Sequence, residues 1–366
     1  MKKDTRKNKF KDMFDFWATN SEEGGWNISS TDEGSQKMLE EENEKQIKIQ
    51  TGTDVIDDFV IDEDTSDDER MIVNMGPQHP STHGVLRLQA ELEGEVVRRV
   101  KPIIGYLHTG MEKTGEELNY FQGPTNTTRM DYLSPLFNEL VFSLTTEKLI
   151  GIEVPDRAKN IRILMTELNR ISSHLVALAT GGMDIGALSM MIFGFREREL
   201  ILNFFEKTTG LRMNHNYIRP GGVAADLPDG WQKDIEEILK IIPEKLQDYD
   251  DMLLDNPIWK GRLQNVGILT TEECFAYGVT GPSLRASGHS WDMRKAQPYS
   301  GIENFEFEVP VLNEGDVFAR WRIKVLEIFE SLKIVEQALN KMPKGPYKVQ
   351  DKKITPPPRK RLDESM

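Results

Sequence analysis

Two histidines, His79 and His83, lie four residues apart in the segment NMGPQHPSTHG (74–84). An imidazole can donate a proton near neutral pH, so such a pair is a candidate for acid–base chemistry. Pro80 lies between the two histidines. A proline inside a helix removes a backbone donor and clashes with the preceding turn, so we do not expect the pair on one helix face.

The glycines, prolines, serine and threonine of this segment predict a turn. It would join short strands at 71–75 and 85–92, where apolar and polar residues partly alternate. A turn on a rigid frame can hold an imidazole at a fixed angle. The spacing alone leaves a second interpretation open, in which both histidines are ordinary turn residues.

The single cysteine and the absence of phosphate-binding loop motifs exclude several kinds of site. The chain has one cysteine, Cys274. A disulfide within the chain and a cysteine-based cage for a metal or an iron–sulfur cluster are therefore impossible. Neither a G-x-G-x-x-G turn nor a Walker-type phosphate loop occurs in the sequence. We expect that this chain does not bind NADH in a Rossmann-type site.

The acidic charge is concentrated in the first seventy residues. Residues 1–70 contain 20 Asp and Glu but only 10 Lys and Arg, whereas the whole chain has a net charge of −14. With few apolar residues to bury, residues 1–70 are predicted to be a disordered extension. The alternative for part of it is a short amphipathic helix around residues 10–17. The acidic balance also disfavours nucleic-acid binding, because it would repel phosphate.

Periodic apolar positions and end signals predict a run of helices. Ser134 and Pro135 are typical of a helix start, and Gly151 of its end. The next helix should open at Asp156 and end near Gly181–Gly182. Its apolar residues recur in steps of three and four and form one buried stripe: Ile161, Leu164, Leu168, Ile171 and Leu175. Further helices are predicted at about 187–209, 230–254 and 316–341.

The mostly apolar stretch 175–195 is the nearest candidate for a membrane span, but it contains Asp184. A carboxylate at the bilayer centre costs about 3 kcal/mol, so we interpret the stretch as two buried helical segments with a break. The predicted fold class is α+β, mainly helical. Within a core at 71–366, residues 71–125 should be mostly β and residues 134–343 a helical bundle.

The segment 74–84 and several motifs after it together resemble one family, the D subunits of the type I NADH-quinone oxidoreductases, or respiratory complex I. The further motifs occur in the family's order and are GYLHTGMEK (105–113), TRMDYLSP (128–135), ELNRISSHL (167–175), ATGGMDIGA (179–187), FRERE (195–199), IRPGGVAADLP (218–228), LRASG (284–288) and PYSG (298–301). The resemblance covers about residues 71–365. It implies a helical bundle similar to the nickel–iron hydrogenase large subunit without its cysteine-held metal site.

The resemblance implies that the chain forms the quinone site of a proton-translocating NADH:quinone oxidoreductase. Quinone reduction to quinol takes two electrons and two protons, and a phenol and an imidazole are suitable proton donors. In the family these roles belong to the second histidine of the HPSTHG motif and the tyrosine of RMDYL, which are His83 and Tyr132 here. Without the resemblance, Tyr132 would be interpreted as an ordinary amphipathic core residue.

Other site residues follow from the same family motifs. Asp184 is the family's partner for the imidazole and would favour its charged form; a helix-capping role is the alternative. Arg129 would lie near the terminal tetranuclear cluster, which the B subunit of the complex carries, and a surface ion pair is the alternative. Thr180 and Met183 would line the quinone pocket, although a packed bundle also explains them.

The resemblance also implies partners, cofactors and a location. The iron–sulfur clusters and FMN would be held by partner subunits, and none by this chain. The expected neighbours are the B and C subunits and, in the membrane arm, the H subunit. The chain would be peripheral to the cell membrane on its cytoplasmic side.

The family continues beyond the segment that resembles ITPPPRKRLDESM, whereas this sequence stops at Met366. A fragment, a split gene product and a shortened subunit are all open. The alternative function is accordingly a shortened, non-catalytic paralogue that acts in structure or assembly.

One position departs from many family members, which have a histidine near the cluster where this chain has Asn214. Asparagine cannot take up a proton when the cluster is reduced. We therefore expect the cluster in the assembled complex to have a low midpoint potential with little dependence on pH, which would suit menaquinone. A redox titration at several pH values measures this, and a steep pH dependence would contradict it.

Overall fold

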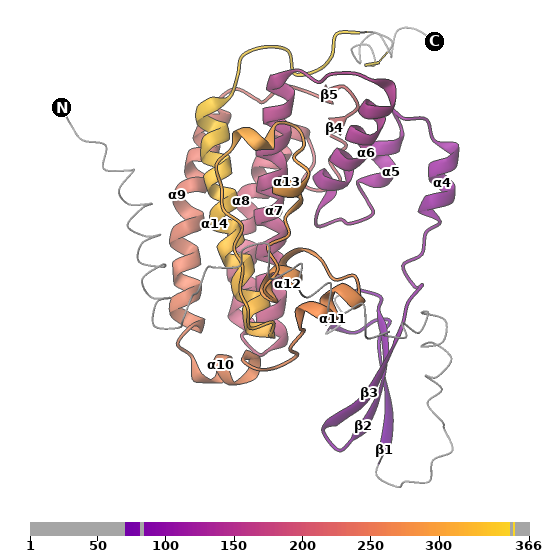
Figure 1. Ribbon diagram of the computed structural model, residues 1–366, viewed down its shortest axis with the longest axis vertical. Coiled ribbons are helices and arrows are strands. Elements are labelled where there is room, and N and C mark those ends of the chain that lie inside the picture. The colour runs from indigo at the N-terminus through magenta and orange to yellow at the C-terminus, as the bar shows by residue number, and fades with distance from the viewer. Residues whose placement is uncertain (1–69, 81–83, 352–353, 356–366) are drawn as a thin grey trace, which may run out of the picture. The chain divides into compact units, whose positions relative to one another are not determined.

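The computed structural model describes residues 70–80, 84–351 and 354–355 (Figure 1). The predicted extension over 1–70 lies outside these residues apart from Arg70, and so does His83. The chain divides into two compact units, Met1–Ile104 and Gly105–Met366.

A three-stranded antiparallel sheet makes up the described part of the first unit. Its strands β1 (Arg70–Met75), β2 (Arg87–Glu93) and β3 (Val96–Ile103) lie in the order β1-β2-β3. The strands predicted at 71–75 and 85–92 are confirmed. His79 pairs with Gly84 in an isolated antiparallel bridge, as expected for a turn that closes on itself between β1 and β2.

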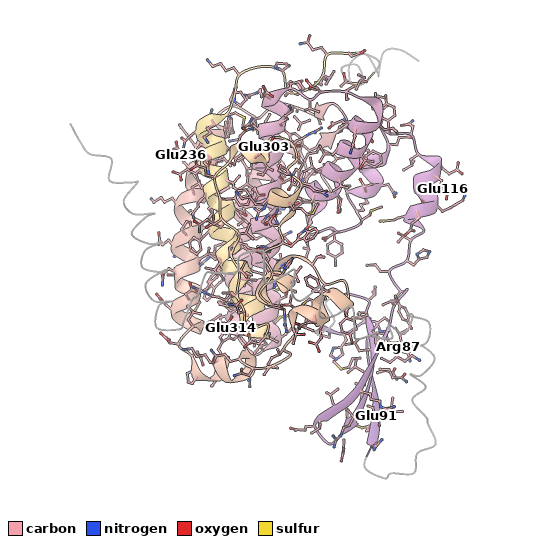
Figure 2. The ribbon with its side chains drawn as sticks, in the orientation of Figure 1. Arg87, Glu91, Glu116, Glu236, Glu303 and Glu314 are labelled. Atoms are coloured by element: carbon pink, nitrogen blue, oxygen red, sulfur yellow. The ribbon has the colours of Figure 1, made fainter. Side chains whose placement is uncertain are left out.

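Polar side chains of the central strand β2, among them Arg87 and Glu91 (labelled in Figure 2), contact both neighbouring strands. Glu91 on β2 is buried and accepts a 3.0 Å hydrogen bond from Arg70, with Arg99 on β3 at 3.8 Å. Arg87 donates to the side-chain oxygen of Asn74 at 2.9 Å. Opposite charges on neighbouring strands stabilise the pairing of both edge strands with β2.

The interval 71–125 contains less β structure than the sequence predicted. The sheet ends at Ile103, and helices α4 (Met111–Glu117) and α5 (Gly123–Thr127) follow. Gly105 and Gly110 have φ values of +116° and +67°, which break the extended chain before α4. These helices are too short to show the periodic apolar pattern that identifies a helix in sequence.

The predicted helix ends of the second unit are confirmed at three long helices. These are α6 (Pro135–Ile150), α7 (Asp156–Asp184) and α8 (Leu188–Thr209). Gly151 and Gly210 follow α6 and α8 in the left-handed conformation, and each N–H bonds to a carbonyl of the preceding helical turn. Glycine adopts this conformation without a Cβ penalty, so the two residues end their helices at defined points.

Four long helices form a closed bundle. They are α7, α8, α9 (Trp231–Leu253) and α14 (Val317–Lys341), and each packs against two of the others in the order α7, α8, α9, α14 (Figure 1). All five residues of the predicted stripe on α7 are fully buried. The fold is α+β and mainly helical, as predicted.

Shorter elements connect and cover the bundle. The hairpin β4 (Ile218–Arg219) and β5 (Gly222–Val223) packs near α6 and α7. The segment before α14 contains α10 (Pro257–Leu263), α11 (Thr271–Ala276), α12 (Gly281–Ala286), α13 (Met293–Ala296) and the short 3-10 helix η2 (Ile302–Asn304).

The break between α7 and α8 lies later than the glycine pair. α7 continues through Gly181 and Gly182 to Asp184, and Gly186, with φ +101°, makes the turn into α8. A Cβ at Gly182 would lie 2.6 Å from the Cβ of Met190 on α8. The glycine therefore allows close approach of two helices and does not end the first one.

Within the described residues, no helix combines the length and apolarity needed to cross a membrane.

Substitution by alanine is expected to change the free energy of unfolding in opposite directions at the two neighbouring glycines, Gly181 and Gly182. Gly182→Ala should lower the free energy of unfolding by about 1–3 kcal/mol, because the new methyl group meets Met190. Gly181→Ala meets nothing within 4 Å and should raise it by up to about 1 kcal/mol through helix propensity. Denaturant or thermal unfolding of the purified chain measures both. Equal effects of the two changes would contradict the close contact.

Candidate functional site

The predicted site residues lie on three parts of the chain. Arg129 and Tyr132 lie between α5 and α6. Thr180, Met183 and Asp184 lie in the last turns of α7, and Asn214 lies between α8 and β4. His83 is outside the described residues, so its distance from Tyr132 stays untested.

The loop that carries Tyr132 is fastened to α7. Asn169, buried on α7, donates to the carbonyl of Leu133 at 2.8 Å and accepts from the N–H of Leu136 at 3.1 Å. The carboxylate of Asp131 accepts from the N–H of Leu133 at 3.0 Å. Tyr132 itself is 45% exposed. It is therefore an exposed ring on a fixed loop, and the interpretation as an ordinary core residue is wrong.

The same face of α7 leads from the Tyr132 loop toward the other predicted residues. Thr180 follows Asn169 by eleven residues, which is close to three helical turns and about 16 Å along the axis. The Thr180 hydroxyl donates to the carbonyl of Val176 at 2.8 Å. Asp184 lies one turn further on, is exposed and is the last residue of α7. The cap position of α8 is Ala187, so Asp184 does not occupy that position.

A buried carboxylate on α6 joins the Arg129 segment to the Asn214 segment. Glu139 is fully buried, and its Oε1 accepts from the Thr128 hydroxyl and from the N–H of Asn216, both at 2.6 Å. Its Oε2 accepts from the N–H groups of Tyr217 and Ile218, both at 2.9 Å. Burial raises the pKa of Glu139 above its ordinary value, and these four hydrogen bonds offset the rise only in part.

These contacts join the segments of two residues, Arg129 and Asn214, that the family resemblance assigned to one place. Thr128 immediately precedes Arg129, and Asn216 follows Asn214 by two residues. The guanidinium of Arg129 is exposed and donates to the carbonyl of Thr125. The surface ion pair considered for Arg129 is not among its contacts in the described part of the chain. Both segments therefore meet at one end of the second unit, beside α6.

The loop after Asn214 is also held at its far end. Glu147, two turns further along α6, accepts from Arg162 at 2.5 Å and from the N–H of Gly221 at 2.7 Å. Arg162 is 1% exposed and donates as well to the carbonyls of Arg219 and Gly222. A buried guanidinium needs such a complete set of acceptors.

His215, next to Asn214, is a buried neutral group. Its Nδ1 lies 3.1 Å from the carbonyl of Leu211, and its ring meets Phe205 edge-on with centroids 4.9 Å apart. Burial lowers the pKa of His215 to about 4, with the Leu211 carbonyl acting in the opposite direction. The ring is therefore neutral at pH 7.

Two family motifs form a second buried network between α7 and α14. In this network His174 on α7 lies 2.7 Å from Glu327 on α14, and Arg285 donates to Glu327 at 2.7 Å. Burial alone would raise the pKa of Glu327, but the hydrogen bond from His174 and the charge of Arg285 lower it to about 2. These groups pair with one another inside the bundle, so we assign them to its stability.

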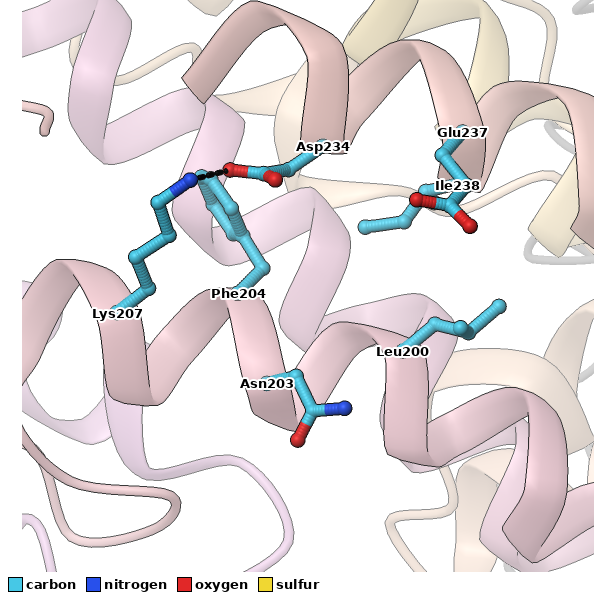
Figure 3. A pocket seen from close by; sticks show the side chains of 7 residues that line it. All are labelled: Leu200, Asn203, Phe204, Lys207, Asp234, Glu237 and Ile238. Carbon is cyan, nitrogen blue, oxygen red and sulfur yellow. Dashed lines mark hydrogen bonds and ion pairs between the residues drawn. The ribbon is translucent and has the colours of Figure 1, made fainter. Parts of the chain in front are cut away.

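Two hollows lie away from the Tyr132 loop. One of about 190 Å³ is lined by Ala177, Gly181, Ile185, Leu263, Val317, Arg320, Trp321 and Lys324. The other, of about 80 Å³, lies between α8 and α9 beside the Lys207–Asp234 ion pair of 2.5 Å (Figure 3). Thr180 and Met183 line neither hollow. A ligand pocket usually encloses roughly 300–1,000 Å³, so both hollows are small for a quinone.

Sequence reasoning missed Glu139 and Glu147. The available signal is a glutamate among apolar neighbours in PLFNELVFSLTTEKLI, which is typical of a buried, paired carboxylate. Within the described ranges, no cluster of three or more His, Cys, Asp or Glu could hold a metal ion.

Comparison with known proteins gives a consistent set of relatives, each described as the D subunit of an NADH-quinone oxidoreductase. Residues 184–366 match the family model described as respiratory-chain NADH dehydrogenase, 49 Kd subunit. The chain is 57% identical over 296 residues to the D 1 subunit of Salinispora arenicola, which covers 80% of this chain and 67% of that protein. It is 58% identical over 292 residues to the D subunit of Rhodococcus jostii, covering 79% and 67%. With the D subunit of Mycobacteroides abscessus it shares 54% identity over 314 residues, covering 85% and 73%.

The buried imidazole of His215 predicts acid sensitivity. Its folded pKa of about 4 lies below the unfolded value of about 6.5, so the unfolded chain binds the extra proton between these two pH values. The free energy of unfolding should fall by up to about 3 kcal/mol as the pH drops from 6.5 to 4. In His215→Phe this part of the pH dependence should disappear. Denaturant unfolding across this range tests it, and parallel profiles for the two proteins would count against it.

Proposed function

Since this chain belongs to the D-subunit family of the NADH-quinone oxidoreductases, and is thus a subunit of the multisubunit complex I, we propose that it provides the quinone-reducing site of that enzyme. Other complex I subunits are its partners. We propose the B, C and H subunits as its direct neighbours, with the chain peripheral to the cell membrane on the cytoplasmic side. The terminal iron–sulfur cluster would belong to the B subunit, and FMN to a subunit further from the quinone.

The observation that carries this proposal is the fixed yet exposed position of Tyr132. A proton donor must meet the substrate at a defined angle, and Asn169 holds its loop to the buried helix α7. At the same time, almost half of the Tyr132 side chain remains accessible. An exposed aromatic ring with a hydroxyl on a rigid support suits a bound ring that is apolar and carries a carbonyl.

In the proposed reaction, the quinone accepts two electrons from the terminal cluster and two protons from this chain. The Tyr132 hydroxyl gives one proton to a quinone carbonyl oxygen as negative charge develops on it. The imidazolium of His83 gives the other proton, to the second carbonyl oxygen. Asp184 favours the charged imidazole and so helps to reload it after turnover. Both donors are then reprotonated from water.

The remaining predicted residues set the environment of the electron donor and of the ring. Arg129 would place a fixed positive charge beside the cluster, which stabilises its reduced form. Asn214 takes up no proton there, in keeping with a low-potential acceptor such as menaquinone. Thr180 and Met183 would contact the quinone further along α7. Partner subunits would complete the chamber around these residues.

The proposal predicts a selective loss in Tyr132→Phe. In the assembled complex, reduction of quinone by NADH should fall by roughly 100-fold or more, because a general acid contributes about 10²–10⁴-fold. Electron transfer from NADH to an artificial water-soluble acceptor should continue. Steady-state assays with the two acceptors measure both rates.

Tyr277→Phe is the matched control, because Tyr277 is 79% exposed and follows α11. It should leave both rates unchanged. Near-normal quinone reduction in Tyr132→Phe would disprove the role of Tyr132. If neither Tyr132→Phe nor His83→Gln lowered the rate in an assembled complex, the non-catalytic alternative would be favoured.

A further inference from the structure

Among the described residues, Glu139 is the one side chain of α6 whose contacts reach both segments that flank the proposed electron donor. Its four hydrogen bonds come from the hydroxyl of Thr128 and from three consecutive N–H groups, those of residues 216–218. None of these contacts depends on the quinone or on the sheet of the first unit. These four hydrogen bonds therefore form entirely within the second unit.

We propose that Glu139 is a positioning residue for electron transfer, which sets Arg129 and the Asn214 segment in one fixed arrangement beside the terminal cluster. This inference rests on the proposed function. Glu139 is not a catalytic residue, because it is fully buried and acts through the two segments that it holds.

A carboxylate satisfies all four donors at this position, whereas an amide cannot. A carboxylate offers two oxygens with about four acceptor sites, which match four donors. In a glutamine, the NH₂ group would face either the N–H of Asn216 or the N–H groups of Tyr217 and Ile218. At least one buried backbone donor would then lose its partner, and the loop would have to shift.

The two asparagines of this loop do not replace the hydrogen bonds of Glu139. Asn214 and Asn216 both adopt positive φ values, +53° and +47°. Their side-chain oxygens are buried and have no hydrogen-bond partner among the described residues. Arg219, further along the loop, donates back to the carbonyl of Asn216 at 2.9 Å and interacts favourably with the charge of Glu139. The backbone at 216–218 thus depends on Glu139 for its place relative to Thr128.

Glu147 is a control that distinguishes a positioning role of Glu139 from a general contribution to the stability of the fold. It is a buried carboxylate of the same helix, and it holds the same loop, but at Gly221 and through Arg162. It contacts neither Thr128 nor the backbone at 216–218 in the described structure. Loss of Glu147 removes the partner of a buried guanidinium and should therefore affect stability at least as strongly as loss of Glu139.

The test uses Glu139→Gln in the assembled complex. The electron paramagnetic resonance spectrum and the midpoint potential of the terminal cluster should both shift. Quinone reduction should fall roughly tenfold, since a displacement of about 1 Å can cost as much as 100-fold. Electron transfer from NADH to the artificial acceptor should stay near normal.

Thr128→Val gives a milder version of the same test. It keeps the side-chain volume and removes only the hydrogen bond on the Arg129 side, so a smaller shift of the same cluster signal is expected. Thr146→Val is its control, because the Thr146 hydroxyl lies on α6 and, within the described residues, bonds only to the carbonyl of Phe142. This pair decides the question if Glu139→Gln or Glu147→Gln fails to assemble.

The outcomes separate this inference from the proposed function. An unchanged cluster signal in Glu139→Gln and in Thr128→Val would overturn it, and so would equal shifts in Glu147→Gln and Thr146→Val. Either result could stand beside a full loss of quinone reduction in Tyr132→Phe, which would leave the proposed function intact. A cluster shift in Glu139→Gln with normal activity of Tyr132→Phe would instead support the positioning role and reject the role of Tyr132.

Discussion

The structure depends on the burial of α7, because this helix contacts α6, α8, α14 and β5 along its length. Its apolar stripe is fully buried, and so are several of its charged and polar side chains. Each of these must find a partner inside the protein, since an unpaired buried charge costs several kcal/mol. Arg162 pairs with Glu147 on α6, and His174 with Glu327 on α14. The bundle is thereby held in one specific arrangement.

The same need to pair buried polar groups also fixes the two loops of the candidate site. Asn169 on α7 satisfies the backbone of the Tyr132 loop, and Glu139 on α6 satisfies the backbone at 216–218. Both loops are therefore fixed by buried groups on rigid helices, whereas the Tyr132 side chain remains exposed. The proposed quinone site would need this combination of rigid support and an exposed side chain.

Much of the helical architecture could be predicted from sequence, and the reasons are local. α6 and α8 end at Gly151 and Gly210, which adopt a conformation that other residues disfavour. The stripe on α7 repeats over four turns. The short helices α4, α5 and α10–α13 were not predicted, because a helix of one or two turns shows no period. The end of α7 was predicted near the glycine pair and lies two residues later, at Asp184, because Gly182 allows the approach of Met190 from another helix and does not itself end α7.

By itself, the sequence determined the family, the mainly helical fold and the identity of the candidate residues, because ordered motifs and apolar periods are properties of the chain alone. The tertiary structure decided that Tyr132 is exposed and that Asp184 ends α7 without occupying the cap position of α8. It also decided that Glu139 joins Thr128 to backbone groups that follow the glutamate by 77–79 positions. Such pairing depends on which donors, far apart in sequence, lie beside the buried carboxylate in the folded chain. A local sequence pattern does not contain this information.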